Sequence, residues 1–164
     1  NLSKINFSSE NIKLSNVDQN KIISEILIQI SDNVSDKNIE IDFNPKNDFF
    51  CLCDTFMISS VYRNILTNAV KFSNPNGKIT IETMFEKKQG IIKIRDYGIG
   101  ISEEHLDELF SPKKIRTTFG TKNEKGSGIG LLITKEYLDK MSGEIFVKSN
   151  VDMGTEFTIK LLTN

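Results

Sequence analysis

The stretch DTFMISSVYRNILTNAVKF, which runs from Asp54 to Phe72, predicts a single amphipathic helix. Its apolar side chains recur at intervals of three and four residues, which places them on one helical face. Asp54 precedes them as an N-cap residue, because its carboxylate can accept hydrogen bonds from the first free backbone N–H groups. The expected core face consists of Ile58, Val61, Tyr62, Ile65, Leu66 and Ala69.

The same helix carries a polar face formed by Asn64, Asn68 and Lys71. Their spacing of four and then three residues places them in one narrow sector, away from the apolar stripe. Amide oxygens are ligands that suit Mg2+, and a lysine ammonium supplies a point charge to phosphate. The polar face therefore indicates a metal–phosphate site, although an ordinary solvated helix surface has the same composition.

Two glycine motifs lie further along the chain. Asp96-Tyr97-Gly98-Ile99-Gly100-Ile101 ends a predicted strand, so its glycines would let the backbone approach a ligand. A carboxylate there can accept a hydrogen bond from an exocyclic amine such as that of adenine. The alternative is a tight turn capped by its own aspartate.

The second motif, Gly126-Ser127-Gly128-Ile129-Gly130-Leu131, directly precedes a predicted helix. Backbone N–H groups at a helix start can bind an anion, and the helix dipole assists them. The motif lacks the Gly-Lys-Ser/Thr of a Walker A loop. The alternative is a flexible hinge into the helix.

The remaining elements follow from hydrophobic periodicity. Residues 111–128 have no apolar periodicity and predict a long loop, which in a compact domain is usually functional or disordered.

Because the strands come in hairpin-like pairs, we expect an α+β fold. This would be a two-layer α/β sandwich with a mixed, mostly antiparallel sheet covered on one face by three helices. Further helices are predicted at 17–34, after Ser102 and at 129–141, and strands at 39–43, 49–53, 78–85, 91–95, 144–148 and 156–162.

Composition narrows the class of protein. The 164 residues carry a formal net charge of -1, which argues against a strongly basic nucleic-acid binder. No apolar run approaches the ~18 residues of a membrane span, so no membrane contact is expected within this chain.

Cys51 and Cys53 are too close for a good disulfide on a strand and are expected to be buried and free. Because the sequence begins without Met, we expect a fragment of a longer protein.

Taken together, Asn64–Phe72, Asp96–Ile101 and Gly126–Leu131 closely resemble the N, G1 and G2 boxes of the sensor histidine kinase catalytic domain. That family shares an ATP-binding fold with type II topoisomerases, heat-shock chaperone ATPases and mismatch-repair ATPases. Leu109-Phe110 resembles its F box, and Asp152–Phe157 resembles its closing G-T-x-F hairpin. The resemblance extends over Val17 to Leu162, in the same order as in the family.

The resemblance implies a role for each matching residue. Asn68 would coordinate Mg2+, with Asn64 as a second ligand or phosphate contact, and Lys71 would reach a phosphate. Asp96 would bind the adenine amine. Residues 111–125 would form an ATP lid whose lysines, including Lys125, stabilise phosphate charge. The other residues expected around ATP are Phe72, Tyr97, Gly98, Gly100, Ile101, Phe110, Gly126, Ser127, Gly128, Ile129, Gly130, Leu131 and Thr155.

Two positions depart from the family pattern, and a third distinguishes the kinases from their hydrolytic relatives. Tyr97 replaces the usual asparagine of the G1 box, and Ser111 follows Phe110 where a second phenylalanine is common. Asn64 stands where the hydrolytic relatives carry a glutamate that acts as a general base. A neutral amide cannot accept a proton from water, so we expect phosphoryl transfer rather than efficient hydrolysis.

The function implied is the ATP-binding catalytic domain of a two-component histidine kinase. Residues 17–164 would form this domain, and residues 1–16 a linker tail from an upstream acceptor hairpin. The expected partners are that phosphoacceptor hairpin and a response regulator, and the fragment would be monomeric. Its location would be cytoplasmic, whether or not the parent protein is anchored in a membrane.

The acceptor histidine is expected outside this chain. The only histidine, His105, lacks the hairpin context and is expected to be an exposed surface residue. The chain would therefore bind ATP without phosphorylating itself. Two alternatives stay open, namely a serine-phosphorylating relative and a catalytically inactive nucleotide-binding interaction module.

Overall fold

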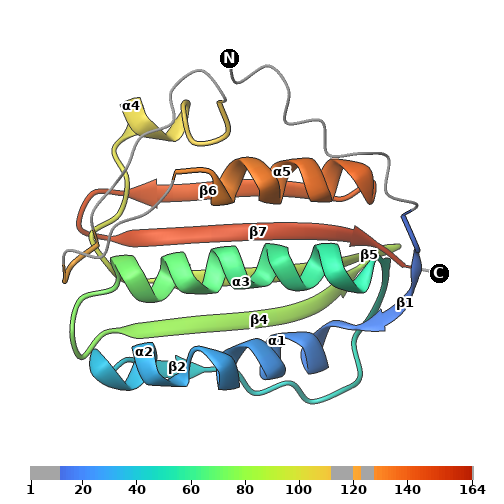
Figure 1. Cartoon of the computed structure of the whole chain (residues 1–164), viewed down its shortest axis with the longest axis horizontal. Helices are drawn as coiled ribbons and strands as arrows, with labels where there is room; N and C mark the ends of the chain where they lie inside the picture. Colours follow the sequence, from blue (N-terminus) through green and yellow to red (C-terminus); the bar gives the residue numbers. More distant parts are fainter. Residues whose placement is uncertain (1–11, 112–119, 123–127, 164) are drawn as a thin grey trace.

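A five-stranded mixed sheet, the helices on one of its faces and a separate two-stranded sheet form the domain (Figure 1). The computed structural model describes residues 12–111, 120–122 and 128–163. The sheet has five strands in the order β2-β4-β5-β7-β6, with β2 and β4 parallel and the other pairs antiparallel. The strands are β1 (Ser15–Asp18), β2 (Glu40–Asp42), β3 (Phe50–Cys53), β4 (Lys78–Glu86), β5 (Gln89–Asp96), β6 (Glu144–Asn150) and β7 (Gly154–Leu162).

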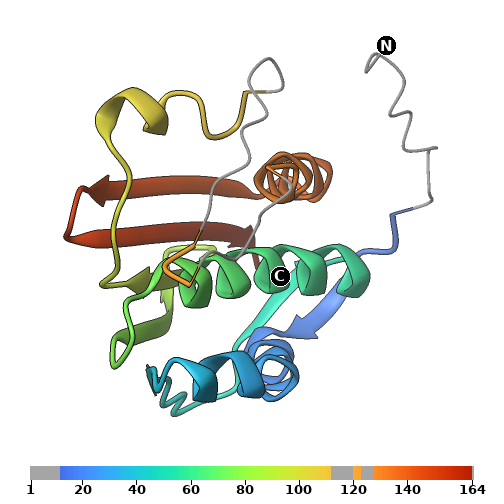
Figure 2. The ribbon, with the colours of Figure 1, turned by 60° about the vertical axis from the view of Figure 1, so that its left-hand side comes forward.

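Three helices, α1, α3 and α5, lie across one face of the sheet, which confirms the expected α+β sandwich (Figure 1). The short helix α4 lies apart from this layer, beyond β6, in both views of the ribbon (Figure 2). None of the described helices is long and apolar enough to cross a bilayer. The helices are α1 (Gln19–Gln29), α2 (Ser31–Asp36), α3 (Thr55–Phe72), α4 (Glu103–Leu106) and α5 (Gly130–Lys140).

Helix α3 is the centre of the core. Asp54 caps it as predicted, since its Oδ1 accepts hydrogen bonds from the amides of Phe56 (3.0 Å) and Met57 (3.1 Å). The predicted apolar stripe is buried against the inner face of the sheet. Alternation along β5 places Ile92, Ile94 and Asp96 on that same inner face.

The N-terminal helix differs from its predicted span of 17–34. Val17 lies in β1, which pairs antiparallel with β3 and includes the last two residues of the expected tail. Asp18 then caps α1, because its carboxylate accepts hydrogen bonds from the amides of Asn20 and Lys21. Near Ile30 the helix breaks, and α2 begins at Ser31.

The ends of two helices are capped in ways that differ from the usual residue preferences. At the end of α5 the left-handed residue is Ser142, with φ of 55°, and not Gly143. Gly143 donates its amide to Leu138 O at 2.8 Å, so it is the second residue of the capping turn. Ser102 occupies the N-cap position of α4, but its hydroxyl contacts His105 Nδ1 (3.0 Å) and does not cap the helix.

Cys51 and Cys53 are free and fully buried on β3, as predicted. Burial raises the pKa of the Cys51 thiol to about 12. Both residues therefore serve as small apolar side chains of the core.

Candidate nucleotide-binding site

Asp96 is a buried carboxylate at the end of β5, and only 3% of its surface is exposed. Its Oδ1 accepts hydrogen bonds from the amides of Gly98 (3.0 Å) and Thr155 (3.3 Å). Burial raises its pKa from 3.8 to about 6, and the two amide bonds act in the opposite direction. The side chain is thus a fixed hydrogen-bond acceptor that is ionised at neutral pH.

The glycines after Asp96 allow the turn to pack against two other parts of the chain. A Cβ on Gly98 would lie 2.0 Å from Phe72 O, and one on Gly100 would lie 1.9 Å from Asn150 O. Between them, Ile99 donates its amide to Phe72 O at 3.1 Å. The G1 motif therefore joins the C-terminal end of α3 to the end of β6.

This close packing should be measurable as a contribution to stability. Gly98→Ala should lower the free energy of unfolding by about 1–3 kcal/mol, because the methyl group must displace the Phe72 carbonyl. Urea denaturation measures the change. Gly130→Ala is the matched control, since its Cβ meets nothing closer than 3.4 Å and alanine is favoured in a helix. Equal stability of both variants would contradict the close packing at Gly98.

Ser149 and Thr155 support the G1 turn from the β6–β7 hairpin. Ser149 Oγ accepts a hydrogen bond from the Ile101 amide (2.8 Å) and lies 2.9 Å from Thr155 Oγ1. Thr155 is 5% exposed, and its amide is one of the two that hold Asp96. Ser149 was missed by sequence reasoning, because nothing in its local sequence distinguishes it.

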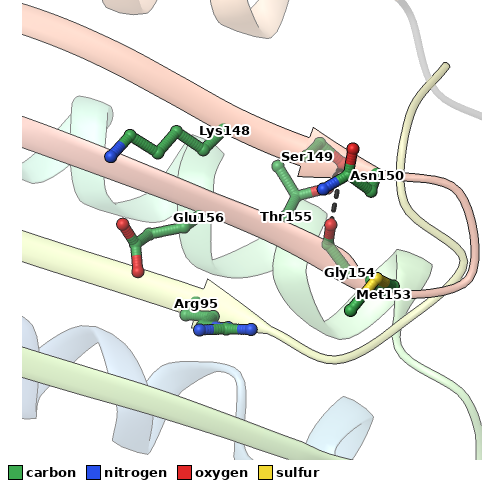
Figure 3. Close-up of a pocket in the computed structure, with 8 residues that line it drawn as sticks. All are labelled: Arg95, Lys148, Ser149, Asn150, Met153, Gly154, Thr155 and Glu156. Atoms are coloured by element: carbon green, nitrogen blue, oxygen red, sulfur yellow. Dashed lines mark hydrogen bonds between the residues drawn. The ribbon is translucent and has the colours of Figure 1, made fainter. Parts of the chain in front are cut away.

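A cavity of about 140 Å3 lies at this end of the sheet (Figure 3). Arg95, Lys148 and Glu156, which line it, project from the sheet face opposite to the helices (Figure 3). Asp96 faces the helices, since consecutive strand residues point to opposite faces. Most of the cavity therefore lies on the face opposite to Asp96, and it adjoins the predicted adenine position only through Thr155, which also lines it.

Asn64 connects α3 to the start of α5. Its Nδ2 donates to Gly130 O (3.0 Å) and lies 3.4 Å from Thr134 Oγ1, which is fully buried. The G2 end of α5 is thus held beside the polar face of α3, on which Asn68 and Lys71 are also half-buried. Lys71 Nζ lies 4.7 Å from the centroid of the Phe72 ring.

The structure places the remaining predicted residues as follows. Gly128 has φ of 72°, a conformation that favours glycine, and Ile129 is the N-cap residue of α5. Phe110 and Leu131 pack against the core.

Tyr97 is 45% exposed, with the Arg95 guanidinium 4.7 Å from its ring centroid. Lys125, Gly126 and Ser127 lie outside the described residues, as does most of the predicted lid.

Helix α3 thus contacts two parts of the predicted site. Its Phe72 carbonyl bonds the G1 turn that follows Asp96, and its Asn64 side chain bonds the start of α5. A family model described as histidine kinase-, DNA gyrase B- and HSP90-like ATPase matches residues 53–164. The chain belongs to this family. Membership confirms the resemblance inferred from the N, G1 and G2 boxes.

Sensor kinases are among the curated relatives of this ATPase-family chain. Sporulation kinase D of Bacillus subtilis is 34% identical over 142 residues, which cover 85% of this chain and 27% of that kinase. Sensor protein SrrB of Staphylococcus aureus is 29% identical over 140 residues, which cover 85% and 24%. The chain therefore spans about a quarter of the length of these two relatives.

Solved structures of histidine kinases have the same fold. The nucleotide-free catalytic domain of histidine kinase ThkA superposes with a TM-score of 0.79 at 25% identity, covering 92% of this chain and 96% of that one. The mycobacterial sensor histidine kinase MprB superposes with a TM-score of 0.76 at 24% identity, covering 92% and 97%. The ATPase-family domain of this chain thus matches histidine kinase catalytic domains over nearly its whole length.

Proposed function

We propose that this chain is the ATP-binding catalytic domain of a sensor histidine kinase. It would position Mg-ATP so that the γ-phosphoryl group is transferred to a histidine on a separate phosphoacceptor hairpin. The buried carboxylate of Asp96, fixed by two backbone amides, is the observation that carries this proposal. An oriented acceptor of this kind suits the exocyclic amine of adenine, because that amine can donate a hydrogen bond to it.

The donor set on α3 fits a magnesium ion bound together with phosphate. Among the described residues, no group of three or more His, Cys, Asp or Glu side chains could hold a metal. Mg2+ often takes only one or two protein ligands and completes its shell with water and substrate phosphates. Asn68 would supply one amide oxygen and Asn64 a second, and the metal would neutralise phosphate charge.

The chain's own residues would then orient the nucleotide for transfer. Lys71 would contact a phosphate, and the Gly126–Gly130 segment would donate backbone amides to the phosphates at the start of α5. Asn64 cannot accept a proton from water, and its Nδ2 is bonded to Gly130 O. Positioning and electrostatic stabilisation would therefore carry the catalysis, while the histidine supplies the nucleophile.

Domain limits and partners belong to the same proposal. Residues 17–164, together with the short strand β1, would form the catalytic domain, and the preceding residues would lead from the acceptor hairpin. ThkA has been crystallised in complex with the response regulator protein TrrA. We infer a response regulator as the downstream partner here as well. Free buried cysteines suit a reducing cytoplasmic compartment.

Calorimetric titration with ATP and ADP, with and without Mg2+, tests the proposed function. Micromolar to millimolar binding that depends on Mg2+ is the expected result. Absence of nucleotide binding in the wild-type chain would overturn the proposal and favour an interaction module. Acid-labile phosphate on this chain alone would contradict the inferred separate acceptor.

Binding of adenosine should depend on pH. The affinity for adenosine should fall about tenfold between pH 7 and pH 5, because the adenine amine bonds the ionised Asp96, whose pKa is raised to about 6. Adenosine is the ligand of choice, since phosphate groups also titrate near pH 6. Titration at several pH values measures the effect, and Asp96→Asn should abolish it. A flat profile in the wild type would remove Asp96 from the adenine contact.

A further inference from the structure

Lys37, directly after α2, is a lysine with only 3% of its surface exposed. Its Nζ donates hydrogen bonds to Lys71 O (2.7 Å) and Val70 O (3.0 Å), and Ser73 O lies 3.5 Å away. These carbonyls belong to the last turn of α3 and the residue after it, where a helix leaves acceptors without partners. A positive charge at this end also interacts favourably with the helix dipole.

Thr121 joins this contact from a distant part of the sequence. Its hydroxyl accepts a hydrogen bond from Lys37 Nζ (2.7 Å) and donates one to Ser73 O (2.7 Å). Its amide donates to Lys71 O at 3.1 Å. The neighbouring Lys122 donates its Nζ to Asp36 O at 2.5 Å. Thr121 and Lys122, from the long 111–128 segment, are therefore hydrogen-bonded to Lys37 and Asp36 at the end of α2.

We propose that Lys37 is a positioning residue for the phosphate end of the site, and that it acts by joining Thr121 to the last turn of α3. The proposal rests on the proposed function. The Lys71 carbonyl accepts hydrogen bonds from both Lys37 and Thr121, so the backbone of the predicted phosphate-binding lysine is fixed from two sides. The next carbonyl, Phe72 O, accepts the Ile99 amide of the G1 turn.

The arrangement has a selective consequence for ligands. Asp96, Gly98 and Thr155 form the adenine end, and the hydrogen bonds of Asp96 to the Gly98 and Thr155 amides do not involve Lys37. The Lys37–Thr121 contact instead fixes the residues expected near phosphate. Loss of this contact should therefore weaken binding of ATP and leave binding of adenosine nearly unchanged.

Thr121→Val tests the proposal, because valine keeps the shape of threonine but cannot accept from Lys37 or donate to Ser73. We expect ATP affinity in Mg2+ to fall about five- to tenfold, while adenosine affinity stays within about twofold of the wild type. Thr121→Ser retains the hydroxyl and should restore ATP affinity. Equal ATP affinity of the wild type and Thr121→Val, or an equal loss for adenosine, would overturn the positioning role.

Lys37→Met supplies a second measurement. Hydrogen exchange of the Thr121 amide should accelerate at least tenfold in this variant, because the side-chain contact that holds Thr121 beside Lys71 O is removed. Unchanged exchange would overturn the proposed contact. Wild-type protein that binds no ATP would overturn the proposed function as well. Tight ATP binding by both wild type and Thr121→Val would overturn the positioning role alone.

Discussion

Asp96→Asn is expected to weaken ATP binding about 10- to 100-fold, the range for loss of a charged hydrogen bond in a buried site. The asparagine retains an Oδ1 that can accept the Gly98 and Thr155 amides, so the turn should keep its shape. What changes is the charge that would face the adenine amine. Titration calorimetry with ATP and adenosine measures the effect, and both ligands should suffer equally.

Stability provides the control for Asp96→Asn. Burial raises the pKa of Asp96 to about 6, so the folded state holds its proton more tightly than the unfolded chain does. The contribution of Asp96 to the free energy of unfolding therefore rises as the pH falls from about 6 toward 4. Above pH 6 the ionised Asp96 carboxylate destabilises the fold. The neutral amide avoids this cost, so the variant should be at least as stable as the wild type at pH 7. Unchanged ATP affinity would contradict the adenine contact.

Asn68→Ala is expected to abolish most of the dependence of ATP affinity on Mg2+, with about a tenfold loss of affinity when Mg2+ is present. The truncated side chain can no longer offer an amide oxygen to the metal, whereas the adenine end of the site is unchanged. ATP titrations with and without Mg2+ measure the two affinities, and adenosine reports on the adenine end alone.

Asn74→Ala is the matched control for this variant, since Asn74 is exposed just beyond the end of α3. It should bind ATP and respond to Mg2+ as the wild type does. Equal losses for ATP and adenosine in Asn68→Ala would show that Asn68 supports the fold and not the metal. Such a result would leave the Asp96 prediction untouched.

Local sequence signals predicted the elements that depend on local chemistry. The Asp54 cap and the 3–4 spacing of the apolar residues determine α3, because both act within one turn of the helix. β1 was missed, because Ser15–Asp18 is stabilised by pairing with Phe50–Cys53, more than thirty residues away. A four-residue strand whose first two residues are exposed has no periodicity that could reveal such pairing.

The residues of the candidate site also divide into those that a local motif predicted and those that only the folded structure reveals. Asp96 and its glycines were predicted from the motif, and the structure adds that a Cβ at Gly98 or Gly100 would collide with Phe72 O or Asn150 O. Lys37 could not be found, because its partner Thr121 lies 84 residues away in sequence. A lysine beside an asparagine in a short helix end usually indicates a solvated surface.

The strand pair β1–β3 has a consequence for how force would reach the domain. The chain enters through β1 next to the Asp54 cap, where Lys13 also donates its amide to Asp54 Oδ2 at 3.0 Å. The opposite end of α3, about 27 Å away at 1.5 Å per residue, carries Lys71 and Phe72. A pull on the entering chain would therefore act first on the β1–β3 pair and the N-terminal end of α3, at the end of the helix remote from Lys71.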